Sequence, residues 1–248
     1  MTTDPSSDPH ELFDVYDSAG RPRGTVKRRA EVHRDGDWHR SFHCWVTCLP
    51  SNGGILSPAG TETRQGAESR SGAETAPGDA EAPILLLQRR GRHKDTWPGR
   101  LDASVGGHYR AGETLSDVIR EVEEEIGRAV ALQALIPLGH RVSVSESEPG
   151  TADRELQDVF LWRAPYPLEA FRPRPVEVTA LEAASVAHLL RLFTGQADRV
   201  PVRTLLPQGQ ILPGTITQED FIPTFDRYFY RVAMLVDLAS RGYPHLVV

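Results

Sequence analysis

Five glutamates fall within the thirteen positions 113–125, and a Gly-Gly pair at 106–107 lies just upstream of them. Carboxylates crowded along a helix repel one another by roughly a few tenths of a kcal/mol per exposed pair. A divalent cation is the simplest group that offsets this repulsion, because hard cations such as Mg²⁺ prefer oxygen ligands. The cluster therefore indicates a metal site, and a solvated acidic helix face is the alternative.

The apolar residues of the same segment predict that it forms a helix. They recur at helical spacing and would place one side of the helix against the protein. These residues are Leu115, Val118, Val122 and Ile126. Thr114 or Ser116 can cap the start of the helix, and Gly127 can end it in a left-handed conformation.

Three of the glutamates, Glu121, Glu124 and Glu125, are spaced i, i+3 and i+4, so their carboxylates share one face of the predicted helix. Arg120 precedes Glu124 by four residues and can orient it. The backbone carbonyl of Gly106 can approach an ion closely, because glycine tolerates conformations that are closed to other residues. These groups are the candidate metal ligands and their positioning residue.

The segment resembles the Nudix box, Gly-x5-Glu-x7-Arg-Glu-U-x-Glu-Glu-x-Gly, in which U is aliphatic. The matching positions are Gly107, Glu113, Arg120, Glu121, Val122, Glu124, Glu125 and Gly127. The match departs from the pattern once, because the spacer 114–119 is one residue shorter. We expect this shortening to rotate or displace Glu113 and to leave the metal face intact.

The resemblance implies an α/β fold, an α/β/α sandwich around a mixed β-sheet. It also implies hydrolysis of a diphosphate linkage in a nucleoside diphosphate derivative or a related small molecule. One to three Mg²⁺ or Mn²⁺ ions would neutralise the diphosphate and lower the pKa of a bound water. A homodimer is a further expectation from the family.

The family pattern also assigns roles. Glu121, Glu124, Glu125 and the Gly106 carbonyl would hold the metal. Glu121 or Glu124 would accept the proton of the attacking water, and the sequence does not choose between them. Arg120 would hold the glutamates in place, and Glu113 is a further catalytic candidate.

Three other segments resemble the Nudix branch that contains isopentenyl-diphosphate isomerase and hydrolase-like relatives. They are residues 12–17, 31–39 and 95–99. This branch raises a rival activity, isomerisation of a prenyl diphosphate. The isomerase needs a cysteine directly before the Gly-His that opens its box, and Gly106 occupies that place here. Glycine cannot donate or accept the proton that moves on carbon, which favours hydrolysis.

The isomerase also uses a histidine-rich metal site. His39 and His108 stand at matching places, whereas His33 is displaced by one residue. Glu155 stands where this branch carries an additional acidic ligand, so it is a candidate for a second metal or a base. A glutamate at a strand end on the surface is the alternative for Glu155. A third hypothesis is a catalytically silent module that keeps the fold and senses nucleotides.

Several basic residues flank the box and can bind the outer phosphates of a substrate, since guanidinium groups match phosphate geometry. The candidates are Arg89, Arg92, Lys94 and Arg100, together with His39 and His108 as phosphate contacts. For each of them an ordinary surface charge or a structural hydrogen bond is the alternative.

Alternation of apolar and polar residues, apolar runs and turn residues predict the remaining elements. The predicted strands are 11–17, 23–26, 38–49, 83–90, 135–145 and 155–163, and the predicted helices besides the box helix are 27–33, 182–194 and 217–240. The C-terminal helix is expected to start near Thr217 or just after Pro223, within an extension 217–248 that packs on a single domain 1–248. Residues 51–82 lack aromatic residues and predict a disordered loop insert.

Composition excludes several classes of protein. A net charge of −6 disfavours binding to nucleic acid through charge alone. No apolar run is long enough for a membrane span, and the first residues lack the pattern of a signal peptide. Cys44 and Cys48 lie on one predicted strand, roughly 13 Å apart, too far for a disulfide. We therefore expect a cytoplasmic protein.

Overall fold

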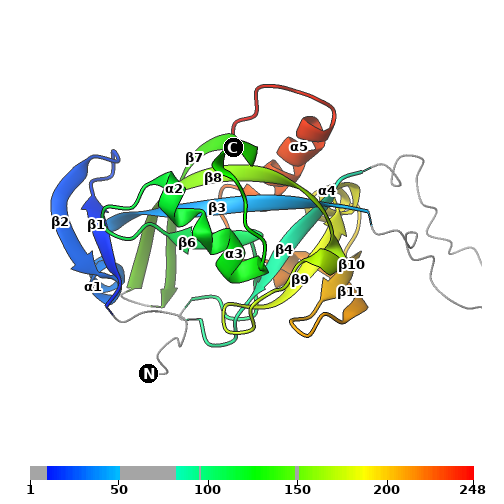
Figure 1. Cartoon of the computed structure of the whole chain (residues 1–248), viewed down its shortest axis with the longest axis horizontal. Helices are drawn as coiled ribbons and strands as arrows, with labels where there is room; N and C mark the ends of the chain where they lie inside the picture. Colours follow the sequence, from blue (N-terminus) through cyan, green and yellow to red (C-terminus); the bar gives the residue numbers. More distant parts are fainter. Residues whose placement is uncertain (1–9, 51–81, 95, 149–150) are drawn as a thin grey trace, which may run out of the picture.

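The computed structural model describes residues 10–50, 82–94, 96–148 and 151–248 (Figure 1). Residues 51–81, nearly all of the predicted loop insert, lie outside these ranges. The strands are β1 (Leu12–Tyr16), β2 (Pro22–Arg28), β3 (Trp38–Leu49), β4 (Ile84–Arg90), β5 (Leu101–Asp102), β6 (Val105–His108), β7 (Leu135–Glu148), β8 (Thr151–Pro167), β9 (Val178–Ser185), β10 (Val200–Leu205) and β11 (Ile211–Ile216). The α-helices are α1 (Arg29–Asp35), α2 (Leu115–Val118), α3 (Arg120–Ile126), α4 (Val186–Phe193) and α5 (Tyr228–Ser240), and the 3₁₀ helices are η1 (Leu132–Ala134), η2 (Leu168–Ala170) and η3 (Gln218–Asp220).

The strands form one mixed sheet whose main path is β11-β10-β9-β4-β3-β1-β2. The long strand β3 is its centre, because β3 also pairs with β6 and, in parallel, with β8. The β7–β8 hairpin extends the sheet beyond that parallel pair. Its parallel and antiparallel pairings confirm the predicted mixed sheet.

Helices cover both faces of the sheet, as predicted for an α/β/α sandwich (Figure 1). Successive residues of β3 point to opposite faces, because side chains alternate along a strand. Trp45 packs in a core with Phe229 and Val232 of α5. Cys44 and Val46 pack in the other core, which contains Val122 of α3. The box helix therefore lies on the opposite face from α4 and α5.

The predicted box helix is divided into α2 and α3 at Ile119. Thr114 caps its start through a hydrogen bond from its backbone N–H to Asp117, and Gly127 ends it with φ 69°. At the division the backbone N–H of Val122 donates to the carbonyl of Ile119, a tighter i+3 turn. This turn begins at Ile119, the last residue of the shortened spacer.

Three predicted helix boundaries are wrong. The helix predicted at 27–33 is α1, Arg29–Asp35, because Lys27 and Arg28 belong to β2. Residues 182–185 belong to β9, because Glu182 lies in a strand that pairs with β4, and α4 begins only at Val186. The C-terminal helix starts at Tyr228 rather than near Thr217 or Pro223. Thr217 instead caps the short helix η3, and Arg227 has a left-handed φ of 55° that separates the preceding segment from α5.

Strands β10 and β11 were not predicted, since Pro201, Pro213 and Gly214 interrupt their patterns.

Both cysteines are free and buried, which agrees with the prediction that they do not form a disulfide. Burial raises the pKa of the Cys48 thiol to about 12 and also raises that of Cys44. We expect the folded protein to react with a thiol reagent at pH 8 at least about tenfold more slowly than the unfolded chain. Ellman's reagent with and without guanidinium measures this, and rapid labelling of the native protein would contradict the burial of these thiols.

No helix in the described part of the chain is both long and apolar enough to span a bilayer.

Candidate functional site

The glutamates on α3 face a small pocket of about 110 Å³ beside strand β6. Glu121, Glu124 and Glu125 line it together with Gly106 and Gly107. Glu125 is buried, and its carboxylate accepts a hydrogen bond of 3.2 Å from the backbone N–H of Gly106. The structure therefore brings the three predicted carboxylates and the glycine pair to one place, which we call the glutamate pocket.

Arg120 lies among the carboxylates of the box. Its guanidinium is 2.9 Å from Glu113, 2.9 Å from Glu121 and 3.7 Å from Glu124. Glu113 thus lies beside Arg120 despite the shortened spacer. One arginine that contacts three carboxylates restricts their rotation and offsets part of their mutual repulsion.

Burial and crowding make the glutamate pocket unfavourable for uncompensated negative charge. Burial raises the pKa of Glu121 to about 7; Arg120 counteracts this and Glu124 adds to it. Burial also raises the pKa of Glu125 well above its usual range. A cation placed among these oxygens would favour their ionised forms, so the donor set fits a hard divalent ion.

A second group of potential ligands lies next to the glutamate pocket. It consists of His33 on α1, His39 on β3, His108 on β6, and Asp153 and Glu155 on β8, and we call it the histidine cluster. One ligand atom each from His33, His39 and His108 lies within 4.8 Å of the others, and the same holds for His39, Asp153 and Glu155. Both groups of three found among the described residues belong to this cluster, whereas the box glutamates form no such group.

The sheet explains why the histidine cluster forms. His39 of β3 is the direct partner of Glu155 in the parallel β3–β8 pair. Asp153 lies two residues before Glu155, and residues two apart on a strand point to the same face. The prediction from sequence missed Asp153, although this spacing is a signal that identifies it.

Several buried polar atoms of the histidine cluster have no hydrogen bond to a described residue, and this suits a metal site. The Nε2 atoms of His33 and His39 and the Oδ1 atom of Asp153 are buried without a hydrogen bond to a described residue. His108 Nε2 lies 3.2 Å from Glu155. Burial lowers the pKa of His33 to about 2 and that of His108 to about 3, so these imidazoles are neutral and able to donate a lone pair. Orphaned nitrogen and carboxylate donors that converge on one point are suited to a divalent cation.

A larger cleft of about 450 Å³ borders both groups. His33, His108, Asp153 and Glu155 line it, and Gly106, Gly107 and His108 are shared with the glutamate pocket. Arginine, tryptophan, phenylalanine and tyrosine residues that line the rest of the cleft are Arg29, Arg90, Arg141, Trp97, Phe225, Tyr228 and Phe229. This cleft is large enough for a small molecule that carries a diphosphate.

A buried polar chain connects the cleft to helix α5. The Nε1–H of Trp45 donates to the hydroxyl of Tyr228 over 2.9 Å, and that hydroxyl lies 3.1 Å from His43 Nδ1. His43 Nε2 is 3.3 Å from the amide of Gln157, which donates to Glu155 over 2.6 Å. The first residue of α5 is therefore linked through side chains to an acid of the histidine cluster.

The predicted phosphate-binding residues separate in the structure. Lys94 lines the glutamate pocket and contacts Glu177. Arg89 is paired with Glu182 at 2.9 Å, Arg92 is exposed, and Arg100 lines a different pocket. Arg29 and Arg90, which were not predicted, line both the cleft and the glutamate pocket. Sheet register, loop conformation and, for Arg29, the position of α1 place these arginines, and the local sequence does not reveal them.

The two glycines of the pair differ in the space around them, so the same substitution is expected to have different effects at each. A Cβ atom added to Gly107 would lie 2.5 Å from Glu121 Cγ, whereas one added to Gly106 would meet nothing closer than 3.7 Å. We expect Gly107→Ala to lower the free energy of unfolding by about 1–3 kcal/mol, because Glu121 must move. Gly106→Ala is expected to stay within about 0.5 kcal/mol of the wild type. Urea unfolding compares the two, and equal stability of both variants would contradict the close approach at Gly107.

Comparisons with known proteins agree with the resemblance seen in the sequence. The family model described as NUDIX domain matches residues 75–205. Nudix hydrolase 3 of Arabidopsis thaliana is 36% identical over 180 residues, which cover 69% of this chain and 19% of that protein. An uncharacterized Nudix hydrolase of Clostridium acetobutylicum is 28% identical over 86% of this chain and 90% of its own length. The isopentenyl-diphosphate Delta-isomerase of Brevibacterium linens is 34% identical over 72% of this chain and 79% of its own length.

Proposed function

Because the chain belongs to the Nudix family, we propose that it hydrolyses a diphosphate linkage in a nucleoside diphosphate derivative or a related small molecule. The observation that carries the proposal is the glutamate pocket, where Glu121, Glu124 and Glu125 surround a space next to Gly106 and Gly107. Hydrolase names among the relatives support the same reaction class.

We propose Mg²⁺ or Mn²⁺ as the cofactor of the glutamate pocket, held by its three carboxylates and the Gly106 carbonyl. The histidine cluster would hold a further divalent ion through His33, His39, His108, Asp153 and Glu155, the last being the additional ligand proposed from sequence. When bound, such ions neutralise charge on diphosphate oxygens and make water a better nucleophile at neutral pH.

The chain's own residues have distinct tasks in this proposal. Arg120 orients Glu113, Glu121 and Glu124 through the contacts described above. Glu121 or Glu124 accepts the proton that the attacking water loses. Lys94, Arg29 and Arg90 line the pockets that would take the phosphates, and their charges stabilise the negative charge that develops as the bond to phosphorus breaks. Arg90 is itself held by Asp102 at 3.0 Å, which fixes the direction of its guanidinium.

A second candidate, isomerisation of a prenyl diphosphate, is favoured by the histidine cluster and by relatives named isopentenyl-diphosphate Delta-isomerase. The chain lacks the cysteine that the isomerase needs, because Gly106 occupies that position. A side chain fits there, because the nearest atoms to an added Cβ belong to His43 and Gln88 at 3.7 Å. Gly106→Cys is therefore expected to fold and, if the rest of the cleft suits the isomerase, to convert isopentenyl diphosphate to its dimethylallyl isomer where the wild type does not. Conversion by the wild type at a comparable rate would overturn the preference for hydrolysis.

A screen of diphosphate compounds with and without Mg²⁺ or Mn²⁺ tests the main proposal. We expect metal-dependent release of a phosphate-containing product from at least one nucleoside diphosphate derivative. Tight nucleotide binding by calorimetry, without turnover of any compound in the presence of metal, would instead support the silent sensing module.

We also propose a cytoplasmic location, in keeping with two free cysteines, since thiols stay reduced there.

A further inference from the structure

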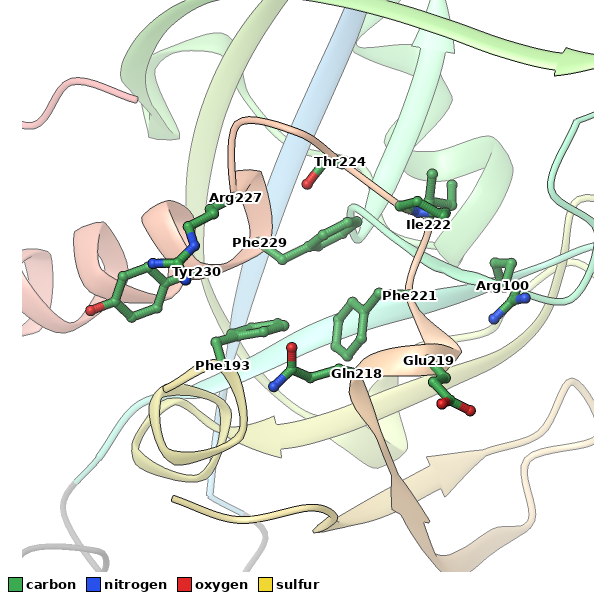
Figure 2. A pocket seen from close by; sticks show the side chains of 11 residues that line it. Arg100, Phe193, Gln218, Glu219, Phe221, Ile222, Thr224, Arg227, Phe229 and Tyr230 are labelled. Carbon is green, nitrogen blue, oxygen red and sulfur yellow. The ribbon is translucent and has the colours of Figure 1, made fainter. Parts of the chain in front are cut away.

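A second pocket of about 480 Å³ shares a wall with the cleft (Figure 2). Ile222, Pro223, Thr224 and Phe229 line both spaces. Its volume is within the range of about 300–1,000 Å³ that is typical of small-molecule sites. None of the box glutamates and none of the histidine cluster lines it, so it is separate from the proposed reaction centre.

The middle of this pocket is aromatic. Phe193 of α4 packs edge-on against Phe221 with ring centroids 5.0 Å apart, and Phe221 contacts Phe229 at 4.9 Å. Figure 2 shows these three rings facing one another at the centre of the pocket. Phe193 is only partly buried, so its ring remains available to a planar ligand. The aromatic ring of a ligand placed there would gain stabilisation from contact with these rings in addition to burial of its area.

Charged groups lie at the two ends of the pocket. Arg227, with Tyr230 beside it, lies at one end, and Arg100 and Glu219 lie at the other (Figure 2). Within the described part of the chain, the guanidinium groups of Arg100 and Arg227 make no hydrogen bond or ion pair. An unpaired guanidinium is suited to a phosphate group, and the Arg227 end is the one without a carboxylate among the lining residues. The Arg100 end offers a donor and an acceptor to the polar edge of a ring.

We propose that this pocket binds a nucleoside monophosphate, with its base on the aromatic floor near Phe193 and its phosphate at Arg227. The ring edge meets Arg100 and Glu219, where an exocyclic amine can donate to the carboxylate. Neither a bare phosphate nor an uncharged nucleoside satisfies both ends of the pocket.

The shared wall connects this second pocket to the cleft. Phe229 contacts Trp45 at 5.9 Å and Tyr228 at 5.8 Å, and both of these belong to the buried polar chain. Asp226, in the same segment as Ile222–Thr224, pairs with Arg141 of the cleft at 2.7 Å. A bound nucleotide that shifts this segment would therefore alter the cleft. This regulatory consequence rests on the proposed function, whereas the binding itself does not.

Isothermal titration calorimetry with AMP tests the proposal on the full chain without any turnover. We expect Arg227→Gln to weaken AMP binding at least about tenfold, the loss expected for one charged hydrogen bond. Phe193→Ala is expected to weaken it as well. Arg23→Gln is the matched control, because Arg23 is exposed on β2, which does not contribute to this pocket, and binding should stay unchanged. Thermal melts establish that each variant is folded.

Two kinds of control, one on the ligand and one on the cleft, distinguish AMP binding in this pocket from AMP binding in the cleft. Adenosine and ribose 5-phosphate should each bind at least about tenfold more weakly than AMP, since each lacks one of the two required parts. Arg29→Gln, a change in the cleft, should leave AMP binding intact. No binding heat at millimolar AMP would overturn the proposal, and so would binding that Arg29→Gln weakens and Arg227→Gln does not. Either result leaves the proposed hydrolysis open to its own screen.

Discussion

Glu121→Gln and Glu124→Gln are each expected to lower kcat by at least about 100-fold, or about 2.7 kcal/mol of activation free energy, while the protein remains folded. Glutamine keeps the shape of each side chain but removes a charge that the pocket would present to a metal and to the proton of the attacking water. Glu121 faces Gly107 and Arg120 from a largely buried position, whereas Glu124 is half exposed. We therefore expect the larger loss for Glu121→Gln.

The control for both variants is Glu123→Gln on the same helix. Glu123 is exposed and does not line the glutamate pocket, so the same change of charge is expected to leave kcat within about twofold of the wild type. Initial rates at saturating Mg²⁺, on whichever substrate the screen identifies, measure the effect. If all three variants behave alike, the glutamates act only as a charged helix face and the assignment fails.

The second large effect concerns metal content. Asp153→Asn and His39→Ala are each expected to weaken metal binding by the histidine cluster at least about 100-fold, because each removes a buried donor atom that has no hydrogen bond to a described residue. Protein equilibrated with Mn²⁺ and then passed through a desalting column would keep the ion of the histidine cluster in the wild type and lose that ion in both variants. Elemental analysis of the eluted protein gives the stoichiometry.

Asp153→Asn is nearly isosteric, so it tests the metal site even if His39→Ala fails to fold. His245→Ala serves as the control, since His245 is exposed near the C-terminus and lies outside the cluster. Its metal content should equal that of the wild type. Equal retention in all four proteins would show that the cluster is a set of buried polar side chains without a metal function.

The sequence predicts the local parts of this protein well and the long-range parts poorly. The bounds of β3 are as predicted, because residues 38–49 are rich in aromatic and β-branched residues and contain no glycine or proline. Both ends of the box helix also agree, since Thr114 and Gly127 have specific capping chemistry. Only the division at Ile119 was missed, and a spacer one residue shorter does not reveal where the helix tightens.

Site residues show the same contrast. The box places its three glutamates at one pocket because their spacing belongs to a single helix. Asp153 and Arg29 come to the site through the pairing of β8 with β3 and through the position of α1, which no local pattern encodes. Arg100, expected beside the diphosphate, lines the second pocket, because its direction depends on the loop between β4 and β5.

The parallel pairing of β3 with β8 has a consequence for the order of events during synthesis. His39 and Glu155 are cross-strand neighbours, although much of the chain separates them. Such distant pairings form late, because the intervening polypeptide must first be made and closed into a loop. A nascent chain on the ribosome therefore presents isolated histidines. The cluster can bind an ion tightly only after β8 has emerged from the ribosome and the sheet is complete.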